Sequence, residues 1–248
     1  MHCTVVDIET TGFLNYDMDA LGNPILSDTC EILSVGYIVI EDSRIDTELE
    51  DELQDPLNEI LGSGVLYFYK PYFKVEATQH ITGLTRDFLQ QYEGDFEKNL
   101  AALETLITNT CIVGKNSDAF DIKVLQGFLN KHKGTVRTIQ LPSLLGMKNY
   151  AGKRFVLEDT TTSIDVQKYF APIYRNLYED RYGIALGKQK KGSLSEYIDL
   201  LECKPVVDLI YNKCKGDTEG SEARAHDALY DCAMTLICYK VLKMLWNS

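Results

Sequence analysis

Two carboxylates stand two residues apart near the start of the chain, as Asp7 and Glu9 in the segment MHCTVVDIETTG. Residues 3–8 are apolar or β-branched apart from Asp7, which predicts an interior strand ending at the TTG sequence of 10–12. Because residues two apart on a strand point to the same face, the two carboxylates have backbones roughly 7 Å apart and can hold a cation between them. A surface-facing acidic pair is the alternative, but an unpaired charge buried within VVDI would be costly.

A second acidic segment is VGKNSDAFDIKVL at 113–125. Its pattern predicts a buried strand that leaves through Gly114 and a polar loop into a helix beginning at Phe120-Asp121. Taken alone, Asp121 is explained better by a favourable interaction with the helix dipole than by catalysis, and the same holds for Asp118.

A third acidic segment is AHDALYDCAMTLICYKVL at 225–242, where Asp231 lies inside a strongly apolar helical pattern that offers it no counter-charge. His226 stands five residues earlier, at or just before the expected helix start. A lone histidine there is more often a cap or a hydrogen-bonded core residue than a base. Asp227 is expected to be an N-terminal residue of the helix. Asp231 is therefore the residue of this segment that is hardest to explain structurally.

The elements that must position these acids follow from periodicity. Further strands are predicted over 31–40 and 65–73, forming an antiparallel meander with the first strand, and a parallel strand is predicted at 111–113. Helices are predicted over 95–109, from about 121 to 131, within 163–200, and from near 226 to Trp246. The 248 residues, 45% of them hydrophobic, can form a single domain. Surface insertions are expected near 13–28, 41–64, 183–192 and 203–222, with a basic run at 188–191.

Composition restricts the class of protein. No stretch approaches the eighteen or so apolar residues that cross a bilayer, and no leader pattern begins the chain. The seven cysteines form no CxxC pair, which predicts reduced thiols in a soluble, intracellular, cytoplasmic protein. A net charge of −12 argues against broad duplex binding. A pocket that grips a few terminal nucleotides through bound cations remains compatible with it.

Three motifs occur in the order seen in one enzyme family: DIETTG at 7–12, NSDAFD at 116–121 and HDALYD at 226–231. Together they resemble the DEDDh exonucleases, the DnaQ-like family. The segments 70–85 and 193–201 also resemble landmarks of that family, so the resemblance covers nearly the whole chain. One departure is the loop between Asn116 and Phe120, which has three residues where many relatives have two. This leaves Asp118 as a minor competitor of Asp121.

The resemblance implies a ribonuclease-H-like α/β fold, a mixed sheet of an antiparallel meander plus parallel strands with helices on both faces. It also implies two divalent cations, Mg²⁺ or Mn²⁺. Asp7, Glu9 and Asp231 would ligate the catalytic metal, and Asp7 would also reach the second ion. Asp121 would hold that second ion through water. His226 matches the general base of the family.

Substrate contacts are implied at three further positions. Thr10 and Thr11 match residues that meet the terminal nucleotide and its 3'-hydroxyl. His80 borders the same pocket, although it is explained equally well as a turn residue without a ligand.

The predicted activity is removal of nucleotides from the 3' end of single-stranded DNA as 5'-monophosphates. Exoribonuclease activity on RNA or short oligoribonucleotides is the alternative, and a DNA polymerase or replication partner is possible in either case. A noncatalytic binding subunit would lack part of the catalytic set, which is complete here. A structural Ca²⁺ site would need an EF-hand-like loop, and none is present.

Overall fold

The computed structural model of the protein describes residues 2–18, 24–41, 59–108, 110–133, 162–215 and 227–247. The strands are β1 (His2–Thr10), β2 (Tyr16–Met18), β3 (Pro24–Leu26), β4 (Ile32–Glu41), β5 (Ile60–Tyr67), β6 (Cys111–Gly114) and β7 (Thr162–Asp165). The helices are α2 (Gln79–Thr82), α3 (Arg86–Gln90), α4 (Phe96–Ile107), α5 (Asp121–Lys133), α6 (Val166–Tyr182), α7 (Leu194–Leu201), α8 (Lys204–Lys215) and α9 (Ala228–Asn247). Two short 3-10 turns, η1 (Val75–Ala77) and η2 (Glu93–Asp95), connect some of them.

Five strands form one mixed sheet in the order β5-β4-β1-β6-β7. The first three of these are antiparallel neighbours, whereas β1, β6 and β7 run parallel. The antiparallel meander and the parallel strand predicted from the sequence are confirmed. Strand β1 lies at the centre, where neighbouring strands flank it on both sides.

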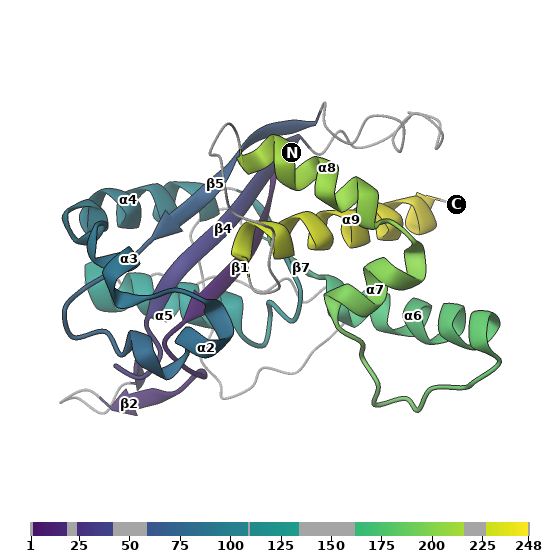
Figure 1. Ribbon diagram of the computed structural model, residues 1–248, viewed down its shortest axis with the longest axis horizontal. Helices are drawn as coiled ribbons and strands as arrows, with labels where there is room; N and C mark the ends of the chain where they lie inside the picture. Colours follow the sequence, from purple (N-terminus) through teal and green to yellow (C-terminus); the bar gives the residue numbers. More distant parts are fainter. Residues whose placement is uncertain are drawn as a thin grey trace.

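Helices cover both faces of this sheet, and each face has its own hydrophobic core. Alternation along β1 directs Cys3 and Val5 into the core beneath α9, together with residues of α6, α7 and α8. Val6 and Ile8 point the other way, into the core formed with α4 and α5. In Figure 1, α9 crosses the sheet on one side and the α4–α5 pair lies on the other. Strand β1 is therefore packed between two layers of helices.

The third predicted strand was wrong in its extent, since pairing with β4 occupies residues 60–67 and not 65–73. The chain leaves the sheet after Tyr67, and the aromatic side chains of Phe68 and Phe73 are buried against Phe96. Burial of these side chains in the core formed with α4 and α5 explains the aromatic pattern that predicted a longer strand.

The expected insertions contain structure of their own. Segment 13–28 includes the two-stranded ribbon of β2 and β3. Segment 183–192 connects α6 to α7, and Lys190 in its basic run pairs with Glu196 at 2.7 Å. Segment 203–222 includes α8, whose inner face joins the core beneath α9, and residues 42–58 and 216–222 lie outside the described part. No described helix is long and apolar enough to cross a membrane.

The start of α9 approaches the sheet unusually closely at Gly36 of β4. A Cβ atom on Gly36 would lie 2.4 Å from the carbonyl carbon and oxygen of Ala228, the first residue of α9. Gly36 is also the residue paired with Asp7 across the β1–β4 ladder. The missing side chain therefore lets the first turn of α9 sit directly beside the acidic part of β1.

Gly36→Ala is expected to displace the first turn of α9 and to lower the free energy of unfolding by about 1–3 kcal/mol, as overpacking does. Gly62→Ala in the neighbouring strand β5 is the matched control, because no atom lies within 4 Å of its added Cβ. Urea unfolding of both variants measures the difference. Equal stability of Gly36→Ala and the unchanged protein would contradict the close approach.

Candidate metal centre

Three carboxylates converge where β1 meets the first turn of α9. One ligand oxygen from each of Asp7, Glu9 and Asp231 can be chosen so that all lie within 4.8 Å of one another. Alternation along β1 places the first two on the face that carries α9, and the close approach at Gly36 brings Asp231 over them. Asp231 thus shares one site with two acids of β1 that are more than 220 positions away in the sequence. The cluster consists only of oxygen donors, which Mg²⁺ and Mn²⁺ prefer.

Asp121 joins this centre from the other side of the sheet end. It is the first residue of α5, is only 6% exposed, and its charge raises the pKa of both Asp7 and Glu9. Its competitor Asp118 is engaged elsewhere, because its carboxylate accepts a hydrogen bond from Ser163 at 2.7 Å and pairs with Lys168. The structure therefore favours Asp121 over Asp118 as the fourth acid.

Burial raises the pKa of every acid in the cluster, and repulsion by the other acids adds to it at Asp7 and Glu9. Burial is the largest cause for Asp7, whose pKa lies well above its usual range, followed by the charges of Asp231 and Asp121. Burial and the same neighbours raise the pKa of Glu9 to about 8. The pKa values of Asp121 and Asp231 rise to about 7, again chiefly through burial. Without a cation, these groups therefore tend to bind protons near neutral pH.

His226 lies outside the described residues, but the next residue, Asp227, accepts hydrogen bonds at the start of α9. One oxygen of Asp227 accepts hydrogen bonds from the backbone N–H groups of Leu229 and Tyr230, at 3.0 and 3.3 Å. The other oxygen accepts a hydrogen bond from the Tyr211 hydroxyl at 2.8 Å. Asp227 is thus the cap of α9, one position before the helix in which the sequence analysis expected it to be an N-terminal residue.

A further buried acid, Asp165, was missed by sequence reasoning. Only 3% exposed, it caps α6 by accepting a hydrogen bond from the Gln167 N–H at 3.0 Å. It also accepts one from the backbone N–H of Asn116 at 2.9 Å, in the loop that leads to Asp121. Its charge contributes to the raised pKa of Asp121. The available signal was an aspartate directly before a helical run, which is typical of an N-cap.

The three residues expected to bind substrate lie around the end of β1. The Thr10 hydroxyl donates to the Gly12 carbonyl at 2.7 Å, and the Thr10 carbonyl accepts a hydrogen bond from the Thr78 hydroxyl at 2.7 Å. That second bond ties the start of α2 to β1, and His80 lies exposed on α2. Thr11 is 2% exposed, and its hydroxyl accepts a hydrogen bond from the Glu31 backbone N–H at 2.8 Å. The Thr11 side chain thus faces inward and holds the turn after β1.

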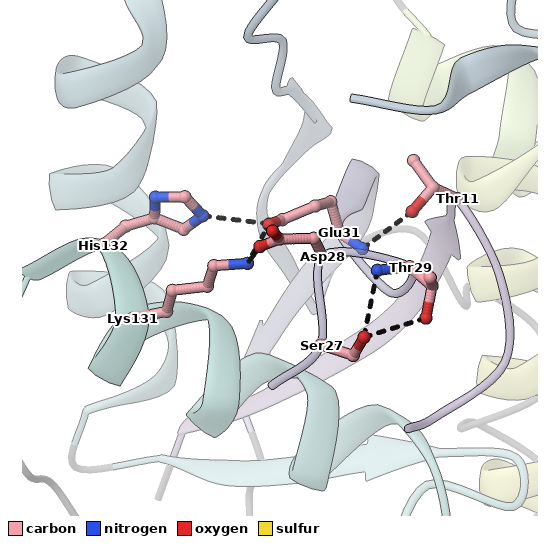
Figure 2. Close-up of polar contacts among 7 residues, drawn as sticks. All are labelled: Thr11, Ser27, Asp28, Thr29, Glu31, Lys131 and His132. Carbon is pink, nitrogen blue, oxygen red and sulfur yellow. Dashed lines mark hydrogen bonds and ion pairs between the residues drawn. The ribbon is translucent and has the colours of Figure 1, made fainter. Parts of the chain in front are cut away.

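A buried ionic cluster lies next to this turn (Figure 2). The carboxylate of Glu31 is fully buried and pairs with Lys131 and with the His132 ring nitrogen, the latter at 2.9 Å. Both partners lie in the last turn of α5, the helix that begins at Asp121. Lys131 also pairs with Asp28, whose side chain is 74% exposed. One end of α5 therefore contributes Asp121 to the acidic centre, and the other anchors the Thr11 turn.

Comparison with known proteins agrees with this architecture at the level of fold. No protein-family profile matches the chain, and no curated protein sequence does. Among solved structures, E. coli exonuclease I in complex with a dA16 oligonucleotide matches 98% of this chain at 18% identity, with a TM-score of 0.53. The zinc-bound complex of the same enzyme with single-stranded DNA matches 99% of this chain at 18% identity, with a TM-score of 0.52.

Exonuclease I from Methylocaldum szegediense matches 100% of this chain at 16% identity, with a TM-score of 0.53. The chain spans 41% of the length of the matched chain in each of these three structures. The likeness shows that the chain has the ribonuclease-H-like fold of these exonucleases, a mixed sheet flanked by helices on both faces. The predicted fold class is confirmed.

Glu31→Gln is expected to lower the free energy of unfolding by about 3 kcal/mol, because it removes the buried charge that Lys131 and His132 face. Asp28→Asn removes the exposed partner of the same lysine and should cost less than about 1 kcal/mol. Urea unfolding of the two variants tests this contrast. An equal loss of stability in both variants would show that the burial of Glu31 does not determine its contribution to stability.

The raised pKa values predict that the metal-free protein loses stability as pH rises. Glu9, Asp121 and Asp231 have folded-state pKa values of about 7 to 8 and unfolded values near 4, and the pKa of Asp7 is also raised. Between these limits the folded state binds more protons than the unfolded state, so the free energy of unfolding falls with increasing pH. Excess Mn²⁺ should reverse this loss, because the cation binds the deprotonated carboxylates of the folded state only.

Denaturant unfolding at pH 5 and pH 8, with EDTA and with Mn²⁺, measures this effect. Asp231→Asn should reduce the decline in EDTA and the gain from Mn²⁺, whereas Asp180→Asn on the exposed end of α6 should change neither. Identical pH profiles for the Asp231→Asn variant and the unchanged protein would contradict the assigned repulsion.

Proposed function

We propose that this protein is a divalent-metal-dependent 3'→5' exonuclease of the DEDDh type, acting on the 3' end of single-stranded DNA and releasing 5'-monophosphates. The observation that carries the proposal is the convergence of Asp7, Glu9 and Asp231 within 4.8 Å, with Asp121 beside them, on a fold shared with exonuclease I. Four acids from three separate elements are difficult to explain by stability, because burial raises the pKa of each of them and the charges of Asp121 and Asp231 oppose those of Asp7 and Glu9.

The donor set fits divalent cations. Asp7, Glu9 and Asp231 would hold one ion. Asp7 would also reach a second ion, which Asp121 would hold through water. A bound cation pair supplies an activated water and neutralises charge on the attacking and leaving oxygens of a phosphodiester. The preference for Mg²⁺ or Mn²⁺ follows from ligands that are all carboxylate oxygens.

The remaining chemistry falls to His226, which directly precedes the cap residue Asp227. In this role its imidazole accepts the proton of the attacking water, whose oxygen forms the new bond to phosphorus as the bond to the 3'-oxygen breaks. A histidine suits this task because its ordinary pKa lies near neutrality.

A cavity beside the turn after β1 supports the choice of a single-stranded substrate. It has a volume of about 430 Å³ and is lined by residues that include Thr11, Phe13, Thr29 and Lys74. Phe13 is 89% exposed, which is unusual for a large aromatic side chain. An exposed ring can stack on a base and a nearby lysine can meet a phosphate, the combination used to bind single strands. Since Phe13 is only four residues beyond Glu9, we expect the end of a strand held here to reach the acids.

Cleavage of 5'-labelled single-stranded DNA and RNA oligonucleotides, with Mg²⁺, Mn²⁺ or EDTA, tests the proposed activity. A metal-dependent ladder that shortens from the 3' end of DNA is expected. A ladder from RNA alone would instead support the exoribonuclease alternative. Absence of cleavage by folded, metal-loaded protein would overturn the enzymatic proposal in favour of a binding subunit.

Two neighbouring aspartates provide a sharp internal comparison for the site. Asp121→Asn should lower kcat by at least about a hundredfold, as loss of one group that stabilises the transition state typically does. Asp118→Asn, three residues away but paired with Lys168 outside the centre, should keep metal-dependent cleavage. His226→Ala should slow turnover and flatten its pH dependence while Mn²⁺ affinity is retained. Equal activity of the two asparagine variants would show that the fourth acid is assigned wrongly.

A further inference from the structure

Lys115 directly follows β6, which ends at Gly114 and is the parallel neighbour of β1. The β1–β6 pairing runs Cys3 with Cys111 and ends with Val5 opposite Val113. Two residues further along each chain come Asp7 and Lys115. A Cβ atom on Gly114 would lie 3.3 Å from the Val6 carbonyl oxygen, so the chain still runs beside β1 at the end of β6. Adjacent strands lie about 4.8 Å apart, and the next residue on each chain is Lys115 and Asp7, so the bend at Lys115 begins close to Asp7.

The charge of Lys115 acts on the acidic centre without being anchored to it. It lowers the pKa of Asp7, Asp121 and Asp231, opposing the effect of burial. Within the described residues, no hydrogen bond or ion pair fixes its ammonium group, although the side chain is partly buried. Lys131 and Lys168, by contrast, are each paired with an aspartate. A partly buried ammonium beside a metal centre is suited to an anion that arrives from outside.

The reach of the side chain supports this placement. The ammonium nitrogen of lysine is five bonds from its Cα, whereas a carboxylate oxygen of aspartate is three bonds away. From a position close to Asp7, Lys115 can therefore extend beyond the Asp7 carboxylate. That is the level at which a phosphate would lie, because it binds on the outer side of any cation held by the acids.

We propose that Lys115 is a substrate-binding residue whose ammonium contacts a non-bridging oxygen of the scissile phosphate. This inference rests on the proposed nuclease function and adds a residue that no motif identified. During hydrolysis the water oxygen bonds to phosphorus and the bond to the 3'-oxygen breaks, while Lys115 keeps its proton throughout. Its contribution is to balance the charge that grows on the phosphoryl oxygens in the transition state.

A purely structural role for Lys115 predicts a different result. If the ammonium served to hold the carboxylates together, its loss would increase their repulsion and disorder the centre, and cation binding would weaken. If it binds phosphate, its loss removes a positive charge that competes with the cations, so cation affinity is unchanged or tighter. Only the phosphate-binding role therefore predicts that nucleotide affinity falls while cation affinity does not.

The experiment compares Lys115→Met, Lys115→Arg and the control Lys98→Met, which removes the same charge from a side chain that is 80% exposed on α4. Calorimetry measures Mn²⁺ affinity, and then the affinity of the Mn²⁺-loaded protein for deoxythymidine 5'-monophosphate. Cleavage of a single-stranded DNA oligonucleotide gives kcat/KM. Lys115→Met should bind Mn²⁺ at least as tightly as the unchanged protein, bind the nucleotide at least about tenfold more weakly, and lose about a hundredfold in kcat/KM.

Lys115→Arg should recover part of both losses, since it keeps the charge, and Lys98→Met should show neither. Nucleotide affinity and kcat/KM that are unchanged in Lys115→Met would overturn the proposal, as would a fall in Mn²⁺ affinity in that variant. If the unchanged protein binds Mn²⁺ but neither binds the nucleotide nor cleaves DNA, the nuclease function itself fails and this inference with it. Cleavage retained by both the unchanged protein and Lys115→Met would remove only the role of Lys115.

Discussion

Repulsion among buried carboxylates is the constraint on which the rest of the structure depends. Burial raises the pKa values of Asp7, Glu9, Asp121 and Asp231, and the charges of Asp121 and Asp231 raise those of Asp7 and Glu9 further, at the end of the central strand. Such a cluster opposes folding unless protons or cations neutralise it. The fold must therefore supply enough packing elsewhere to hold four unfavourable groups at one point.

That packing comes from the position of β1 between two hydrophobic cores. Cys3 and Val5 are buried beneath α9, and Val6 and Ile8 against α4 and α5, so the strand that carries the first two acids is held from both faces. Helix α9 brings Asp231 to the strand only because Gly36 leaves room for its first turn. The geometry of the centre is thus decided by apolar contacts that surround it.

Ionic groups in the protein are divided between two tasks. Glu31 is fully buried and faces Lys131 and His132, and this cluster fixes the turn after β1 to the end of α5. The acidic centre differs, because most of the charges that act on Asp7 belong to other acids and raise its pKa. Of the charges that shift this pKa, only that of Lys115 lowers it. A paired acid stabilises a loop, whereas repelling acids prepare a site for cations.

The sequence by itself determined the local part of this arrangement. Alternation placed Asp7 and Glu9 on one face, apolar periodicity predicted α4, α5 and α9, and the three motifs indicated the fold class, because each depends on residues close together in the chain. Only the tertiary structure decided that the charge of Asp121 acts on Asp7 while Asp118 binds Ser163, that Asp165 caps α6, and that β5 ends at Tyr67. It also decided the neighbours of Gly36 and Lys115. These outcomes depend on contacts between segments far apart in sequence, and a local pattern carries no information about which distant atoms fill the space beside it.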